Sequence, residues 1–162
     1  MTTIESRETA PPKARHKAFT YRTSTEWTSG RSGVLGAAGR PALSVSSPPE
    51  FKGEAGRWTP EDLFVAAIDL CTMTTFASFA QRLDLPLVSY RSEAEGLLEF
   101  VDGGYRFTRV VLRPVIVVAD PASVELAAKA MRGAHEACLI GRSVRAEVVV
   151  EPRIEVATSA RG

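Results

Sequence analysis

The chain has 162 residues, the length of one domain, and folding at this size buries roughly two-thirds of the surface that the unfolded chain exposes. Hydrophobic residues make up 44% and charged residues 24%, a balance typical of a globular protein and not of a disordered, collagen-like or membrane-spanning chain. The formal net charge of +1 provides no overall field to attract nucleic acid or an anionic membrane surface. We therefore expect partners to be recognised at a local site.

The cysteine content and the N-terminal residues indicate the cellular compartment of the protein. The two cysteines, Cys71 and Cys138, are too few for a small domain held together by disulfides. The N-terminal residues include no apolar segment of the kind that directs secretion or spans a membrane. These features predict a cytoplasmic protein whose thiols are mostly reduced.

The first third of the chain predicts a tail followed by short strands. Residues 1–15 are polar and contain almost no apolar side chains, so we expect a disordered tail and a single domain over residues 16–162. Alternation of apolar and polar side chains predicts a first strand between His16 and Trp27. Glycine turns then predict a meander of short strands that ends near Ser46.

A long helix is predicted from Pro60 to about Leu83. Thr59 supplies an N-cap hydroxyl, Pro60 fits the first helical position, and two acidic residues follow where the positive end of the helix dipole lies. Asp69 is the only charged residue in the interior, LFVAAIDLCTMTTFASFA, so we expect a core helix enclosed by other elements. Its length would also suit a membrane span, but Asp69 and the Thr and Ser content favour a core helix.

The second half of the chain predicts a hairpin, a helix and a strand. Residues 86–119 form the predicted antiparallel hairpin, with its turn at Asp102-Gly103-Gly104. Asp120-Pro121 repeats the helix-start arrangement and predicts a second helix from residue 121 to about 138. Alternation predicts a closing strand between Val144 and Val156, which completes an α+β domain with two core helices and antiparallel strands.

Cys71 lies in the middle of the first predicted helix. A single cysteine in an apolar helix is usually a small hydrophobic residue of the core. Its helical neighbours on the same side are small or weakly polar: Ala67, Thr74, Thr75 and Ser78. They leave room beside the sulfur for a second sulfur, a backbone segment or a ligand, although tight helix packing would use the same residues.

Cys138 lies at the predicted C-terminal end of the second helix. If the two helices pack together, a disulfide could join the cysteines, since a bridge needs Cα atoms about 4.4 to 6.8 Å apart. The alternative is two unrelated buried thiols. His135 has a metal-like spacing from Cys138, but two ligands do not make a zinc site, so we predict no metal.

The segment Trp58–Ala67 that leads to Cys71 resembles a motif of the OsmC/Ohr family, Pro-Glu-X-Leu-Phe-X-Ala followed by a spacer of about four residues and then Cys. This family comprises the osmotically inducible and organic hydroperoxide resistance proteins. Ala134–Cys138 resembles its second cysteine motif, and Gly30–Gly33 falls where the family has an arginine in a glycine-rich loop. The resemblance covers residues 17 to about 156 and places the chain in an OsmC-like branch.

The resemblance implies a thiol peroxidase that reduces organic hydroperoxides and forms an intertwined homodimer, with long buried helices wrapped by antiparallel sheet. Cys71 would be the peroxidatic cysteine, and its sulfenic acid would condense with Cys138, the resolving cysteine, to a disulfide. Arg31 would favour the Cys71 thiolate, and Glu61 would orient Arg31. Turnover would need an external dithiol reductant, which the family suggests is a lipoyl protein in the Ohr branch, and no resident cofactor.

Two features of the sequence leave alternatives open. Ten residues separate Glu61 from Cys71 and span about 15 Å of straight helix, so either the helix breaks after its first turn or a second chain contributes. Leu139 follows Cys138, where the Ohr branch usually has proline. The competing interpretations are a non-catalytic protein that binds a hydrophobic ligand and a redox-sensing stress protein, both with the same fold.

Overall fold

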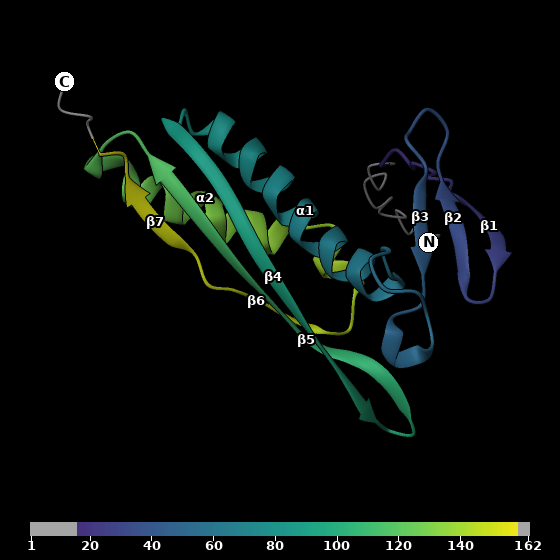
Figure 1. Cartoon of the computed structure of the whole chain (residues 1–162). Coiled ribbons are helices and arrows are strands. Elements are labelled where there is room, and N and C mark those ends of the chain that lie inside the picture. Colours follow the sequence, from purple (N-terminus) through teal and green to yellow (C-terminus); the bar gives the residue numbers. More distant parts are fainter. Residues whose placement is uncertain (1–15, 159–162) are drawn as a thin grey trace, which may run out of the picture.

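Two β-sheets and two main helices make up residues 16–158, the part of the chain that the computed structural model describes (Figure 1). The predicted tail, residues 1–15, lies outside the described residues. The smaller sheet is an antiparallel meander in the order β1-β2-β3, and the larger sheet is built on the long antiparallel hairpin of β4 and β5. In chain order the main elements are β1 (Ser24–Ser29), β2 (Ser32–Gly36), β3 (Leu43–Ser46), α1 (Pro60–Arg82), β4 (Leu87–Val101), β5 (Gly104–Val118), α2 (Val124–Ala137), β6 (Glu147–Val150) and β7 (Arg153–Val156). The fold is α+β, as predicted.

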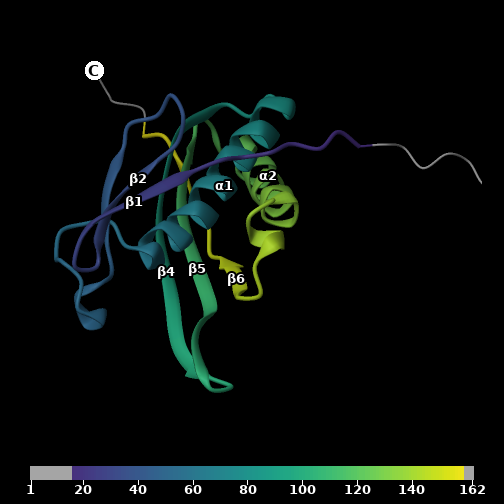
Figure 2. The ribbon, with the colours of Figure 1, turned by 90° about the vertical axis from the view of Figure 1, so that its right-hand side faces the viewer.

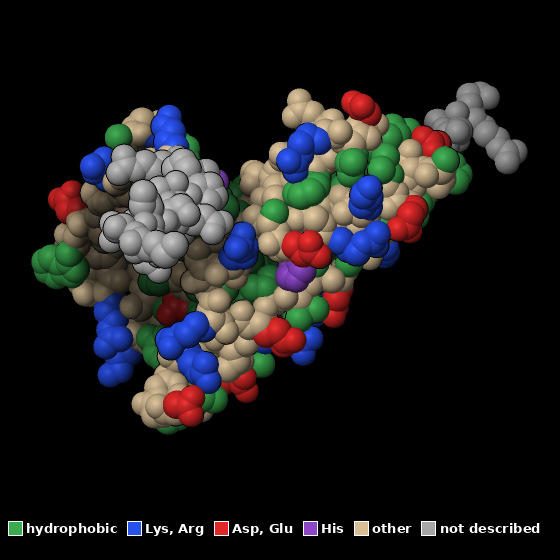
Figure 3. Space-filling model, turned by 180° about the vertical axis from the view of Figure 1, so that it is seen from behind, with side chains coloured by type: hydrophobic (Ala, Val, Ile, Leu, Met, Phe, Trp, Pro, Cys, Tyr) green, Lys and Arg blue, Asp and Glu red, His purple; other side chains and the backbone are tan. Residues whose placement is uncertain are grey.

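Three short 3-10 turns connect these elements: η1 (Pro49–Phe51), η2 (Pro121–Ser123) and η3 (Gly141–Ser143). Both helices pack on the same face of the larger sheet, where Val110, Leu112, Ile116 and Val118 of β5 are buried (Figure 2). Basic and acidic side chains are interspersed over the face seen in Figure 3, in keeping with the net charge of +1. The core therefore lies between the two helices and the hairpin.

The first strand is shorter than predicted. It begins at Ser24, and the described residues before it, 16–23, form no strand. Ser24 pairs with Gly36, the last residue of β2, so the residues upstream of Ser24 extend past their neighbouring strand. The predicted start of the strand, based on the alternation around Phe19 and Tyr21, was wrong. A strand also needs a neighbouring strand with which its backbone can form hydrogen bonds.

Helix α1 forms where the sequence predicts it. The Asp62 N–H donates to the Thr59 hydroxyl at 3.1 Å, and the Thr59 N–H donates to the Asp62 carboxylate at 3.0 Å, which makes a capping box. The helix runs without a break to Arg82. One side of it is buried, but Leu70 on another side is 58% exposed, so a single chain encloses α1 only in part. The helix is also long and apolar enough to cross a membrane, a property that the core helix of a globular protein can share.

The predicted closing strand is two strands, β6 and β7, and both pair with β5 in parallel. Pro152 lies between them and has no N–H to donate, so the hydrogen-bond ladder is interrupted there. The antiparallel expectation was wrong for this strand. Helix α2 is the crossover connection that returns the chain to the same end of the sheet, and such a connection gives parallel pairing.

Replacing Phe76 by alanine should destabilise the fold by about 3 to 5 kcal/mol, because the change removes a buried ring and leaves a cavity. The ring packs in the cluster between the two helices and the sheet, 5.3 Å from the ring of Tyr90. Urea denaturation measures the free energy of unfolding. Val88→Ala, at an exposed position of β4, should change it by less than about 0.5 kcal/mol, and equal losses in the two variants would contradict this description of the core.

Candidate functional site

Both cysteines lie where the middle of α1 meets the end of α2. Cys71 is partly buried, Cys138 is 2% exposed, and both are free thiols. The turn η3, which follows Cys138, also contacts α1. Thr72, the next residue after Cys71 in α1, has its hydroxyl 3.5 Å from the Cys138 sulfur, and the Cys138 thiol is one of the groups that lower the pKa of Cys71. Two cysteines 67 positions apart in the sequence therefore share one site.

The sulfur of Cys71 is surrounded by neutral hydrogen-bond donors. Burial raises the pKa of the Cys71 thiol, but four hydrogen bonds outweigh burial and hold the pKa below its ordinary value. Their donors, in order of effect, are the backbone N–H of Ile140, the thiol of Cys138, the backbone N–H of Leu139 and the hydroxyl of Thr75. Each of these bonds favours the thiolate, because it stabilises the charged form of the sulfur.

Because α2 ends at Ala137, the backbone N–H groups of residues 139 and 140 can face Cys71. The helix ends at Ala137, and Cys138 has an extended backbone with φ −60° and ψ 113°. The N–H groups of residues 139 and 140 therefore lie beyond the helix, in the turn before η3. Successive N–H groups in a turn form a concavity that binds negative charge, which here is a thiolate.

Arg31 lies in the turn between β1 and β2, where its guanidinium donates to the carbonyl of Phe51. Figure 1 shows this sheet beside the N-terminal end of α1, whereas Cys71 lies halfway along that helix. A single chain therefore does not bring Arg31 to Cys71. The donors that lower the Cys71 pKa within this chain carry no formal charge.

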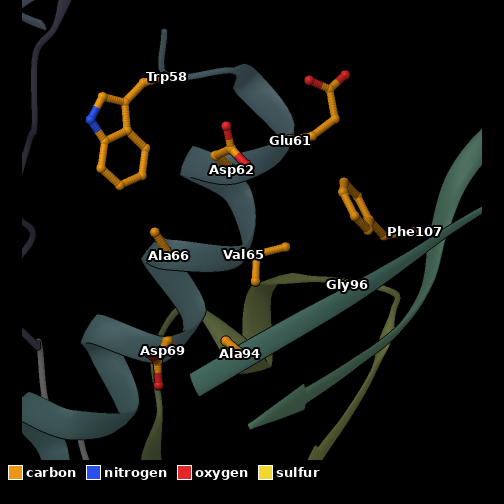
Figure 4. A pocket seen from close by; sticks show the side chains of 9 residues that line it. All are labelled: Trp58, Glu61, Asp62, Val65, Ala66, Asp69, Ala94, Gly96 and Phe107. Atoms are coloured by element: carbon orange, nitrogen blue, oxygen red, sulfur yellow. The ribbon is translucent and has the colours of Figure 1, made fainter. Parts of the chain in front are cut away.

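Glu61 lies in the first turn of α1 and lines a cavity of about 350 Å³ between the helix and the hairpin. Figure 4 shows Glu61 on the first turn of α1, on the same side of the helix as Phe107 of β5, with its carboxylate directed away from that ring. Among residues 16–158, Glu61 Oε2 is buried without a hydrogen-bond partner. Because α1 is unbroken, the structure excludes a helix break as the way to bring Glu61 to Cys71.

Sequence reasoning missed two features of the site. Backbone N–H groups carry no residue-type signal, and the only hint of their position was Gly141, a helix-stop residue soon after Cys138. Thr72 resembles any other small residue of α1 in the sequence, yet its hydroxyl is 3.5 Å from the Cys138 sulfur. Within the described part of the chain, no group of three or more His, Cys, Asp or Glu side chains could hold a metal ion.

Residues 53–153 match the family model described as OsmC-like protein. The chain belongs to the OsmC-like family. It is similar to YmaD of Bacillus subtilis, described as an uncharacterized protein, with 26% identity over 117 residues that cover 70% of this chain and 78% of YmaD.

Solved structures of OsmC-like proteins share the fold. An OsmC-like protein of unknown function from Vibrio cholerae is 27% identical, covers 83% of this chain and 99% of its own, and superimposes with a TM-score of 0.77. An organic hydroperoxide resistance protein from Legionella pneumophila is 24% identical, covers 87% of this chain and 100% of its own, and has a TM-score of 0.68. The arrangement of helices and sheets is therefore that of OsmC-like proteins.

Removing the N–H of residue 139 should raise the pKa of the Cys71 thiol. Leu139→Pro deletes this donor, and the extended backbone of Cys138 is the conformation that a residue before proline prefers. The rate of Cys71 alkylation by iodoacetamide rises as the thiol ionises, so its midpoint should move to higher pH in this variant. Leu139→Ala keeps the N–H and should leave the midpoint unchanged. Equal midpoints in the proline variant and the unaltered chain would contradict a role for this amide.

Proposed function

We propose that the protein is a thiol peroxidase that reduces organic hydroperoxides through Cys71 and Cys138. The observation that carries the proposal is that Cys138 contacts α1 beside Cys71, a thiol whose pKa is lowered in part by Cys138. The thiolate is the nucleophile in such chemistry, so the donors around Cys71 favour the reactive form near neutral pH. Membership of the OsmC-like family and similarity to a hydroperoxide resistance protein support the same conclusion.

The proposed reaction has two chemical steps. The Cys71 thiolate attacks one peroxide oxygen, the O–O bond breaks, and the alkoxide takes a proton and leaves as an alcohol, which makes Cys71 a sulfenic acid. The Cys138 sulfur then forms a bond to the Cys71 sulfur, and the sulfenic oxygen leaves as water. An external dithiol, a lipoyl protein being one form, reopens the disulfide by exchange. We also propose that the protein works in the cytoplasm, where such reductants keep thiols available.

The apolar rim of the site favours an organic hydroperoxide over hydrogen peroxide. Leu139 is 71% exposed and Ile140 is also exposed, and the backbone N–H groups of both residues lower the pKa of Cys71. An alkyl or aryl hydroperoxide that approaches the sulfur can bury apolar surface against these side chains, whereas hydrogen peroxide has none to bury.

We propose that Arg31 and Glu61 act on Cys71 across an intertwined homodimer. Glu61 has a buried oxygen without a partner among residues 16–158, and a guanidinium from a second chain would satisfy it. The exposed side of α1 around Leu70 is apolar, as expected of a surface that a second copy covers. In this arrangement Arg31 would add positive charge to a thiolate that backbone donors already stabilise.

Sedimentation equilibrium should give twice the mass of the chain for the unaltered protein. Leu70→Asp places a charge on the side of α1 proposed to meet a second copy, so it should shift the equilibrium toward the single chain. Val88→Asp, at another exposed position, should leave the dimer intact. A single chain at micromolar concentration, or equal effects of the two substitutions, would contradict the proposed assembly.

Stopped-flow mixing with cumene hydroperoxide tests the proposed activity. Reduced protein should lose its thiols at least about a hundredfold faster than free cysteine, because both the ionised fraction and the fit of the substrate raise the rate. Cys71→Ser should abolish the fast phase. Cys138→Ser should keep it but stop at the sulfenic acid, without catalytic cycles.

The competing functions give different results in the same experiment. Thiol loss at the rate of free cysteine would overturn the peroxidase and leave a protein that binds a hydrophobic ligand. Formation of the Cys71–Cys138 disulfide without turnover by any dithiol would instead indicate a redox sensor.

A further inference from the structure

Thr72 follows Cys71 in the sequence but contacts the other cysteine. Its side chain is 0% exposed, and its hydroxyl is 3.5 Å from the Cys138 sulfur. The backbone N–H of Gly141 donates to the same sulfur at 3.3 Å. Two donors, one from α1 and one from the turn after α2, therefore meet at the Cys138 sulfur.

The hydroxyl of Thr72 also has a second acceptor. It lies 2.9 Å from the carbonyl oxygen of Ile68, one turn earlier in α1. A bond of this kind is common for a buried threonine in a helix. A hydroxyl has one proton, so Thr72 can donate to Ile68 or to Cys138 at any moment, but not to both.

The two acceptors differ in how much they need this proton. The Ile68 carbonyl already accepts the backbone N–H of the next helical turn, so it remains satisfied when the hydroxyl turns away. The Cys138 sulfur gains negative charge only when it loses its proton to attack Cys71, and a donor to a charged sulfur is worth more than a donor to a carbonyl. The Thr72 hydroxyl is therefore placed to donate to the Cys138 sulfur when that sulfur becomes negatively charged.

We propose that Thr72 is the positioning residue for Cys138 in the disulfide-forming step: its hydroxyl turns from the Ile68 carbonyl to the Cys138 sulfur when that sulfur loses its proton, before it attacks oxidised Cys71. This inference rests on the proposed function for its biological meaning. In that step the electron pair of the Cys138 sulfur forms the S–S bond and the S–O bond of the Cys71 sulfenic acid breaks. The departing oxygen takes up the proton that Cys138 has lost and leaves as water.

The same attack can be followed without peroxide. Cys71 reacts with the aromatic disulfide 5,5′-dithiobis(2-nitrobenzoate) and releases one thionitrobenzoate anion, which leaves a mixed disulfide on Cys71. Cys138 then attacks the Cys71 sulfur and releases the second anion. The absorbance of thionitrobenzoate shows the two releases as separate phases. The second phase should be absent in Cys138→Ser, which assigns it to the attack by Cys138.

Thr72→Val keeps the size of the side chain and removes the hydroxyl. We expect the second phase to slow by roughly tenfold, the effect of losing one hydrogen bond to a charged group, while the first phase keeps its rate. Thr72→Ala should act in the same way, and Thr72→Ser, which retains the hydroxyl, should restore the second phase. With cumene hydroperoxide, the valine variant should also accumulate the sulfinic form of Cys71, because a slower second step leaves the sulfenic acid exposed to more peroxide.

An unchanged second phase in both hydroxyl-free variants would overturn the proposal. Equal slowing of both phases would also overturn it, because a general disturbance of α1 would affect Cys71 as much as Cys138. If cumene hydroperoxide reacts slowly with the unaltered protein while the second phase still depends on the Thr72 hydroxyl, the peroxidase function fails and the role of Thr72 stands.

Discussion

The packing of α1 against α2 is the interaction on which the site depends. Ala127, Ala130 and Ala134 of α2 are fully buried, and side chains this small allow two helices to lie close together. Phe76 of α1, five residues beyond Cys71, fills the same cluster. The end of α2 consequently meets the middle of α1, and residues distant in the sequence join one hydrogen-bond network.

That network concerns how the Cys71 thiolate is stabilised. A mid-helix cysteine lies too far from the helix N-terminus to benefit from the dipole, and a cation is the usual alternative. Here the donors within one chain are backbone amides, a thiol and a hydroxyl, all uncharged. In the proposed homodimer, Arg31 supplements these donors instead of acting alone.

Signals within a few residues of each other predicted the helices. The strand partners and the contacts between the helices depend on residues far apart in the sequence, and these the sequence did not predict. The start of α1 could be recognised because Thr59 and its neighbours act within one turn, and the two cysteines could be recognised by residue type. The start of β1 and the parallel pairing of β6 and β7 depend on partner strands, which alternation does not specify. The amides of residues 139 and 140 and the contact of Thr72 with Cys138 depend on how the helices pack, so the sequence indicated only, through Gly141, that α2 ends nearby.

Cys71 precedes the residues that stabilise its thiolate in the chain, and this order matters while the protein is being synthesised. The ribosome synthesises Cys71 long before residues 138–140, whose groups stabilise its thiolate. Until those later residues emerge and α2 docks, the Cys71 thiol lacks the donors that lower its pKa in the folded chain. In the proposed peroxidase, the fraction of Cys71 present as thiolate would therefore rise only when α2 has docked, so that full reactivity would belong to the folded protein.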